Sequence, residues 1–152
     1  MNFLKTEGEN LMFHLSRREK DLLLDLIKMY PLVPPAHYQL SSADGANEAN
    51  QQLLDEALGE HREEAKREVQ TMLAEVNRFQ TASSGCTLTL SAGELEALLQ
   101  ILNDIRVGSW LLLGSPDEKQ GKRARLSLKT AKYFWAMDLA GHFQTALLAA
   151  RQ

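Results

Sequence analysis

The sequence is short of cysteine and of long apolar runs, and each shortage excludes a class of protein. Cys86 is the only cysteine among the 152 residues, so neither an intrachain disulfide nor a multi-cysteine metal site can form. No apolar run approaches the roughly 20 residues that a membrane-spanning helix needs. The first ten residues, MNFLKTEGEN, lack the basic start and apolar core of a signal peptide. These absences predict a cytoplasmic protein that does not enter a membrane.

The composition is that of an ordinary globular protein, with 44% apolar and 24% charged residues. A length of 152 residues suits one domain with a sizeable core, so we expect a single domain over residues 1–152. The net charge of −3 gives the chain as a whole no bias toward nucleic acid or anionic membranes. Residues 31–47 and 114–127 are rich in turn-forming or charged residues, and we expect both segments to be mobile loops.

Apolar periodicity predicts a mainly α (α+β) fold of about four helices with a small antiparallel sheet. Ser16 and Glu19 have the spacing of a capping box, and Pro31 ends the helix that follows them. A long region without proline, rich in Ala, Glu, Leu and Gln, favours a second helix. In chain order we expect strands at 2–6 and 11–15, helices at 16–30 and 46–79, a linker at 81–85, a strand at 86–90, and helices at 91–113 and 128–150.

The chain contains two copies of one pattern, 75 positions apart. The residues from Phe13 to Ile27 match those from Leu88 to Leu102 in their strand-like start, their capping box and their apolar spacing. Because capping boxes and leucine are common, a coincidental match has about even odds. If the repeat is structural, the two strands share one small sheet and both helices pack on it.

The central helix carries three polar residues in otherwise apolar surroundings: Asn103, Asp104 and Arg106. Asn103 and Arg106 are three positions apart, so their side chains can meet beside Trp110, whereas Asp104 points to the other flank. The favoured interpretation is a structural polar network that holds neighbouring helices, because partly buried charges need partners. The alternative is a site for a ligand or partner.

No familiar catalytic or cofactor motif is present: there is no Gly-x-Ser-x-Gly elbow, no Walker loop and no Gly-x-Gly-x-x-Gly turn. His61 lies among glutamates on one helix, but neither the Glu-x-x-His nor the His-Glu-x-x-His metal spacing occurs. No basic residue lies near Cys86 in the sequence to lower its pKa, so we interpret it as an apolar filler. We therefore expect no enzyme activity, no metal and no cofactor.

A basic cluster runs from the loop after residue 116 into the last helix, and it is a candidate anion-binding segment. Tyr133 and Trp135 follow it and offer planes on which bases could stack. The alternative is that these cations pair with the acidic helix over residues 48–68. The cluster consists of Lys119, Lys122, Arg123, Arg125, Lys129 and Lys132.

The hexapeptide Leu102–Val107, LNDIRV, resembles the Leu-Asn-Asp-Leu-Arg-Leu core of an uncharacterised bacterial family, the domain-of-unknown-function family numbered two thousand and seventeen. Leu90–Ser91 and Leu113–Gly114 match the family's helix start and stop. Trp110 stands where a small residue is expected and Leu112 where an arginine is expected, which puts any charged role of that position in doubt. The resemblance implies a cytoplasmic bacterial protein, often encoded beside the adaptor of the Clp protease and sometimes labelled a transcriptional regulator. It implies no catalytic residues.

These observations favour a non-enzymatic cytoplasmic interaction or regulatory protein with a protein partner. The alternative function is a nucleic-acid-binding transcriptional regulator that uses residues 119–132. We also expect a homodimer, because the helix at 128–150 is apolar on most of its sides.

Overall fold

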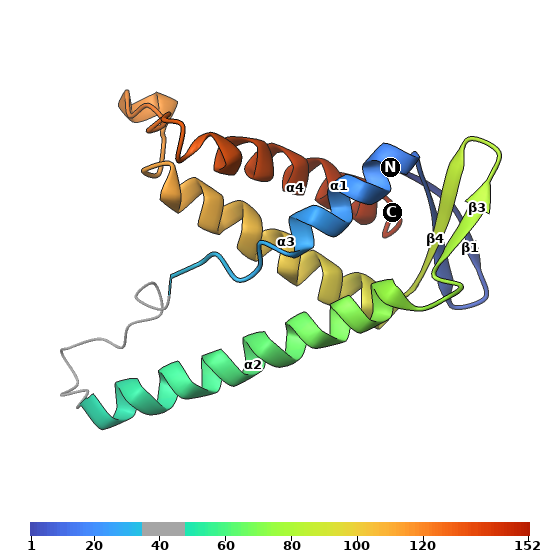
Figure 1. The fold of residues 1–152 in the computed structure, drawn as a ribbon, viewed down its shortest axis with the longest axis horizontal. Coiled ribbons are helices and arrows are strands. Elements are labelled where there is room, and N and C mark those ends of the chain that lie inside the picture. The colour runs from blue at the N-terminus through green and yellow to red at the C-terminus, as the bar shows by residue number, and fades with distance from the viewer. Residues whose placement is uncertain (35–47) are drawn as a thin grey trace.

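The computed structural model describes residues 1–34 and 48–152, in which four helices pack beside a four-stranded antiparallel sheet (Figure 1). This confirms the predicted α+β class with about four helices, and the sheet rules out an all-α fold. Most of the predicted loop 31–47 lies outside the described residues. The strands are β1 (Asn2–Glu7), β2 (Asn10–Leu15), β3 (Phe79–Ala82) and β4 (Gly85–Ser91). The helices are α1 (Arg17–Ile27), α2 (Glu48–Ala74), α3 (Ala92–Leu112) and α4 (Ala131–Ala149), with a short 3-10 helix, η3 (Glu118–Gln120).

The two copies of the repeat meet at the middle of the sheet, whose strand order is β1-β2-β4-β3. Phe13 pairs with Leu88, its own counterpart in the repeat, and the antiparallel register continues on both sides of this pair. A two-fold rotation at this pair therefore exchanges β2 with β4. Arg17 and Ala92, the first residues of α1 and α3, are likewise 75 positions apart. The prediction that the two strands share one sheet is confirmed.

The outer strands extend the symmetry, and one of them was missed by the sequence analysis. Residues 79–82, predicted as the end of a helix and part of a linker, form β3 and pair with β4. The preceding helix ends at Ala74, because Arg78 turns the chain there: its Nε donates to the Met72 carbonyl (3.1 Å) and its Nη1 to the Thr89 carbonyl (2.7 Å). Each repeat is thus a β-hairpin followed by a helix.

The core lies between the sheet and the helices. The side chains of Phe13, Leu88 and Leu90 on the central strands are fully buried, as are Leu98 and Ile105 on α3 and Phe143 on α4. These apolar side chains recur at strand or helix spacing in the sequence, which is why the pattern predicted most of the elements. The core also includes Leu15, Leu23, Leu95, Ile101, Leu102 and Leu147.

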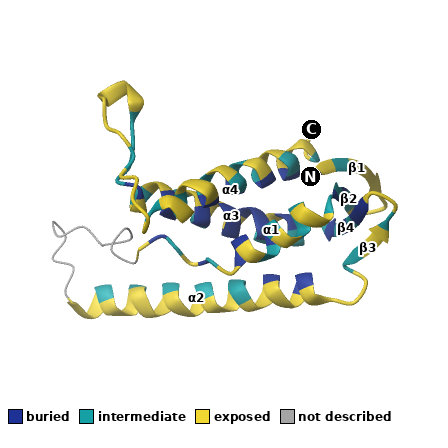
Figure 2. Ribbon diagram, turned by 45° about the horizontal axis from the view of Figure 1, so that its top comes forward, coloured by how far each residue is buried: buried dark blue, intermediate teal, exposed yellow. Residues whose placement is uncertain are grey.

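Each half of the chain has two helices: β1, β2, α1 and α2 make the first half, and β3, β4, α3 and α4 the second. The second helices of the two halves, α2 and α4, pack differently from each other. α4 packs along α3 within its own half, and Ala136, Ala140 and Phe143 point into the core. α2 instead packs on α3 of the other half, and its buried residues, Val69, Met72 and Leu73, all lie near its C-terminus. Toward its N-terminus α2 diverges from α3 and is mostly exposed (Figures 1 and 2).

Both capping boxes form, and each glutamate also binds a cation from the start of its hairpin. At the start of α1 the Glu19 N–H donates to the Ser16 hydroxyl, and the Ser16 N–H donates to the Glu19 carboxylate. The same carboxylate pairs with the Met1 ammonium. Ser91 and Glu94 do the same for α3, and Glu94 binds the Arg78 guanidinium at 2.7 Å. Burial alone would raise the pKa of Glu19, but these bonds lower it to about 2, and Arg78 likewise holds the pKa of Glu94 below its usual range.

Glu94→Gln is expected to lower the free energy of unfolding at pH 7 by about 1–2 kcal/mol, because the cap can form but the charged bond to Arg78 is lost. Since the folded pKa of Glu94 is below the ordinary value of 4.5, the lost stabilisation is present above that pH and fades as the pH falls through the folded pKa. Urea unfolding between pH 7 and pH 3 should show the two stability curves converge. Glu9→Gln, in the exposed β1–β2 turn, serves as the control, and parallel curves for wild type and Glu94→Gln would contradict the assignment.

Candidate functional site

Of the three polar residues on α3, Asp104 has a structural role. Its carboxylate accepts the backbone N–H of Leu32 at 2.6 Å and that of Val33 at 3.3 Å, which fastens the chain beyond α1 onto α3. Gly108, one turn further along, allows this close approach: a Cβ there would lie 2.4 Å from the Leu32 Cβ. Asp104 therefore acts as a clamp between the two halves, consistent with the predicted structural role.

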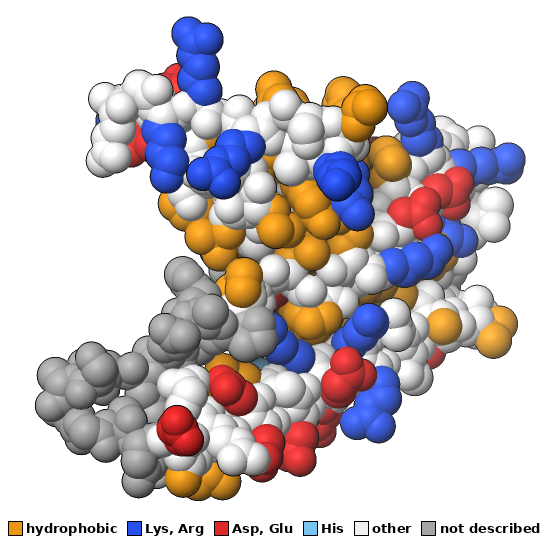
Figure 3. Space-filling model, turned by 60° about the vertical axis from the view of Figure 1, so that its left-hand side comes forward, with side chains coloured by type: hydrophobic (Ala, Val, Ile, Leu, Met, Phe, Trp, Pro, Cys, Tyr) orange, Lys and Arg blue, Asp and Glu red, His pale blue; other side chains and the backbone are white. Residues whose placement is uncertain are grey.

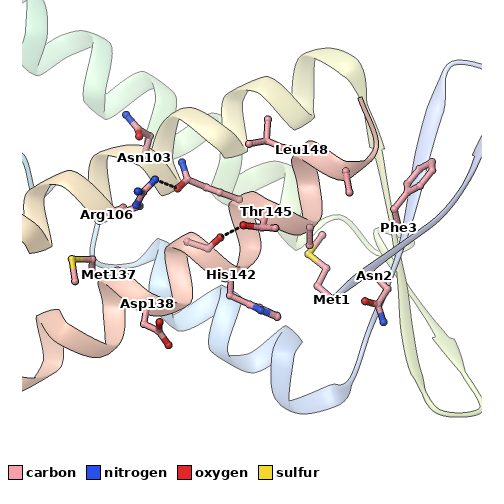
Figure 4. Close-up of a pocket in the computed structure, with 14 residues that line it drawn as sticks. Met1, Asn2, Phe3, Asn103, Arg106, Met137, Asp138, His142, Thr145 and Leu148 are labelled. Carbon is pink, nitrogen blue, oxygen red and sulfur yellow. Dashed lines mark hydrogen bonds between the residues drawn. The ribbon is translucent and has the colours of Figure 1, made fainter. Parts of the chain in front are cut away.

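Asn103 and Arg106 do not join Asp104 in one network, so the alternative of a ligand or partner site at these two residues stays a prediction. Both residues are exposed, and among the described residues the one polar contact of the Arg106 side chain is a long one, 3.5 Å, to the Gln144 amide oxygen. They line an open groove beside α4 (Figure 4). Asp138 and His142 lie on the other side of α4 in this view, so the polar groups of the groove do not converge on one point.

The basic segment folds into a defined turn at the far end of α3 and α4. The backbones of Asp117 and Lys122 exchange two hydrogen bonds of 2.8 Å around η3, and Arg125 N–H donates to the Leu113 carbonyl at 2.7 Å. This geometry does not test whether residues 114–127 are mobile, which stays a prediction.

Among residues 1–34 and 48–152, no acidic side chain pairs with any of the six cations, Lys119, Lys122, Arg123, Arg125, Lys129 and Lys132. The alternative that they pair with the acidic helix is therefore wrong for this chain conformation. Lys132 instead lies over the Tyr133 ring, 5.0 Å from its centroid. The cluster keeps its charge available at the surface.

Large apolar side chains lie beside two of these cations. Trp110 and Phe134 line a hollow of about 740 Å³ together with Lys122 and Arg123. Phe134 is 45% exposed, and the neighbouring Trp135 is 64% exposed. We call this surface the basic–aromatic end; it consists of Trp110, residues 117–132, Phe134 and Trp135. Trp110 was expected beside Asn103 and Arg106. In the fold its indole Nε1 donates instead to the Pro116 carbonyl at 3.1 Å, so the ring faces the loop.

The basic–aromatic end contrasts in charge with the rest of the molecule. Its six cations and two acids, Asp117 and Glu118, give residues 117–132 a net charge of +4, so the remainder of the chain carries −7. Figure 3 shows Lys and Arg side chains over the upper part of one face, apolar atoms below them, and Asp and Glu side chains over α2 at the bottom. A few acidic side chains also lie in the upper part and a few basic ones in the lower part, so the contrast is one of net charge.

We also considered a metal site, a reactive cysteine and a membrane-spanning helix. In the part of the chain that the structure describes, no group of three or more His, Cys, Asp or Glu residues is arranged to hold a metal ion; His37 lies outside that part. Cys86 is buried, and burial raises its pKa, which disfavours the nucleophilic thiolate. A search of the described helices for one long and apolar enough to span a bilayer finds none.

Comparison of the chain with protein-family models, with curated proteins and with solved structures finds no match. The resemblance of Leu102–Val107 to the uncharacterised bacterial family therefore stays a prediction.

Asp104→Ala is expected to lower the free energy of unfolding by about 1–3 kcal/mol, because two backbone donors lose their acceptor. Arg106→Ala, two positions along the same helix, should change it by only a few tenths of a kcal/mol, since the arginine is exposed and has one weak contact. Chemical denaturation of both variants measures the difference. Equal losses would show that Arg106 shares the structural role of Asp104.

Proposed function

We propose that this chain is a non-enzymatic interaction protein of a regulatory kind, and that it binds an acidic protein segment through the basic–aromatic end. The observation that carries the proposal is the combination of six cations that have no acidic partner among residues 1–34 and 48–152 with a hollow lined by Trp110 and Phe134. Exposed apolar surface beside uncompensated charge is typical of a binding surface.

The apolar side chains favour a protein partner over a nucleic acid. Leu126 is 67% exposed and Leu128 is fully exposed, and aliphatic side chains gain little from contact with phosphates. Tryptophan and arginine, by contrast, are the residue types that most often dominate protein interfaces. The remaining charge of −7 also opposes a long polyanion, whereas a short acidic segment meets only the positive end.

We propose a non-enzymatic role because the sequence contains no familiar catalytic motif. We also propose a cytoplasmic location, which a chain with a single cysteine suits. The regulatory character rests on the family resemblance alone.

Both tryptophans of the chain belong to the basic–aromatic end, so intrinsic fluorescence reports binding there directly. We expect a leucine-containing acidic peptide to shift this fluorescence at low salt, with an affinity that falls as salt is added. Lys122→Glu/Arg123→Glu should weaken binding at least about tenfold, because two attractive contacts become repulsive.

Arg17→Glu/Arg18→Glu is the matched control, since it makes the same change of charge on exposed residues at the start of α1. A single-stranded oligonucleotide is titrated in parallel. Tighter binding of the oligonucleotide than of the peptide, lost in the Lys122/Arg123 variant, would favour the alternative of a nucleic-acid-binding regulator. A lack of response to either probe would refute the basic–aromatic end as a binding surface.

A further inference from the structure

We propose that the basic–aromatic end receives the N-terminal half of α2 from a second copy of the chain, and that two copies join through two such contacts. We call residues 48–60 of α2 the acidic arm. This proposal rests on the function proposed above, because it names an occupant of the same surface.

The acidic arm carries a negative charge that complements the positive charge of the basic–aromatic end. Its four acids, with no lysine or arginine among them, give residues 48–60 a net charge of −4, against +4 at the basic–aromatic end. The basic residues of α2 all come later in the helix, at Arg62, Lys66 and Arg67. Within the part of the chain that the structure describes, Asp55 and Glu56 accept side-chain hydrogen bonds only from glutamines one turn away, Gln51 (2.9 Å) and Gln52 (3.2 Å). The acids of the arm are Glu48, Asp55, Glu56 and Glu60.

One face of the acidic arm pairs an apolar side chain with two carboxylates. Leu53 is 64% exposed, and Glu56 and Glu60, three and seven positions later, lie on the same side of the helix. The hollow in the basic–aromatic end has the matching parts, an apolar wall of Trp110 and Phe134 with Lys122 and Arg123 beside it. Leu53 fits the apolar wall while its two glutamates meet the two cations.

The positions of the two surfaces allow the contact to be reciprocal. The basic–aromatic end and the acidic arm lie at opposite ends of one face, with apolar atoms between them (Figure 3). A rotation of 180° about an axis that lies in the plane of this face, perpendicular to the line joining the two surfaces, turns the two faces toward each other and places each basic end opposite the other copy's acidic arm. A closed two-fold dimer follows, with the same contact made twice.

The contact also gives the surface a means of regulation. While the acidic arm of one copy covers the basic–aromatic end of the other, an external acidic segment has to displace it. Self-association and partner binding therefore exclude each other, and an acidic peptide in excess dissociates the dimer.

Charge reversal tests the contact from both sides. Sedimentation velocity at low salt and tens of micromolar protein should show a dimer for wild type, which salt dissociates. Glu56→Lys/Glu60→Lys on the arm, and separately Lys122→Glu/Arg123→Glu on the end, should each weaken dimerisation at least about tenfold. Glu7→Lys/Glu9→Lys, two exposed acids at the tip of the first hairpin, is the control and should remain dimeric.

The chain that carries both reversals restores opposite charges and should dimerise again, as should an equimolar mixture of the two reversed variants. A monomeric wild type, or a dimer that both reversals leave intact, overturns the proposal. A monomer whose tryptophan fluorescence still responds to the acidic peptide refutes self-association and leaves the proposed function standing. A monomer without that response refutes both.

Discussion

The pairing of β2 with β4 is the contact on which the rest of the structure depends. Each repeat alone is a two-stranded hairpin with one helix, which is at best marginally stable. Joining the central strands with Phe13 opposite Leu88 makes one sheet of four strands and buries both side chains completely. Because the pairing relates the halves by a two-fold rotation, α1 and α3 leave the sheet from equivalent positions and share one core.

The sequence predicts the parts of this fold that local signals specify. Ser16 and Ser91 mark both helix starts through their capping boxes, and the repeat predicts that the central strands meet. β3 and the end of α2 were missed because they depend on Arg78, whose carbonyl partner on Thr89 is 11 residues away. No local periodicity encodes such a contact.

The candidate site, too, could be predicted from the sequence only in part. The density of lysine and arginine after residue 116 is visible in the sequence, but whether those cations are paired depends on where α2 lies. The helical pattern places Asp104 and Arg106 on α3, but it does not predict which of the two contacts another segment of the chain. The partner of Asp104 is the backbone of Leu32, 72 residues earlier, and Arg106 faces open surface. Distance along the chain, more than chemistry, sets the limit of sequence-based prediction here.

Because α2 and α4 pack differently, the two helices differ in how well they tolerate substitution. α4 buries Phe143 and Leu147 in the core, so most substitutions on its buried side destabilise the fold. The first half of α2 contributes none of the buried residues of its helix. Replacements there leave the scaffold's stability nearly untouched, so during evolution this stretch is free to drift, or to specialise, while the symmetric sheet stays constant.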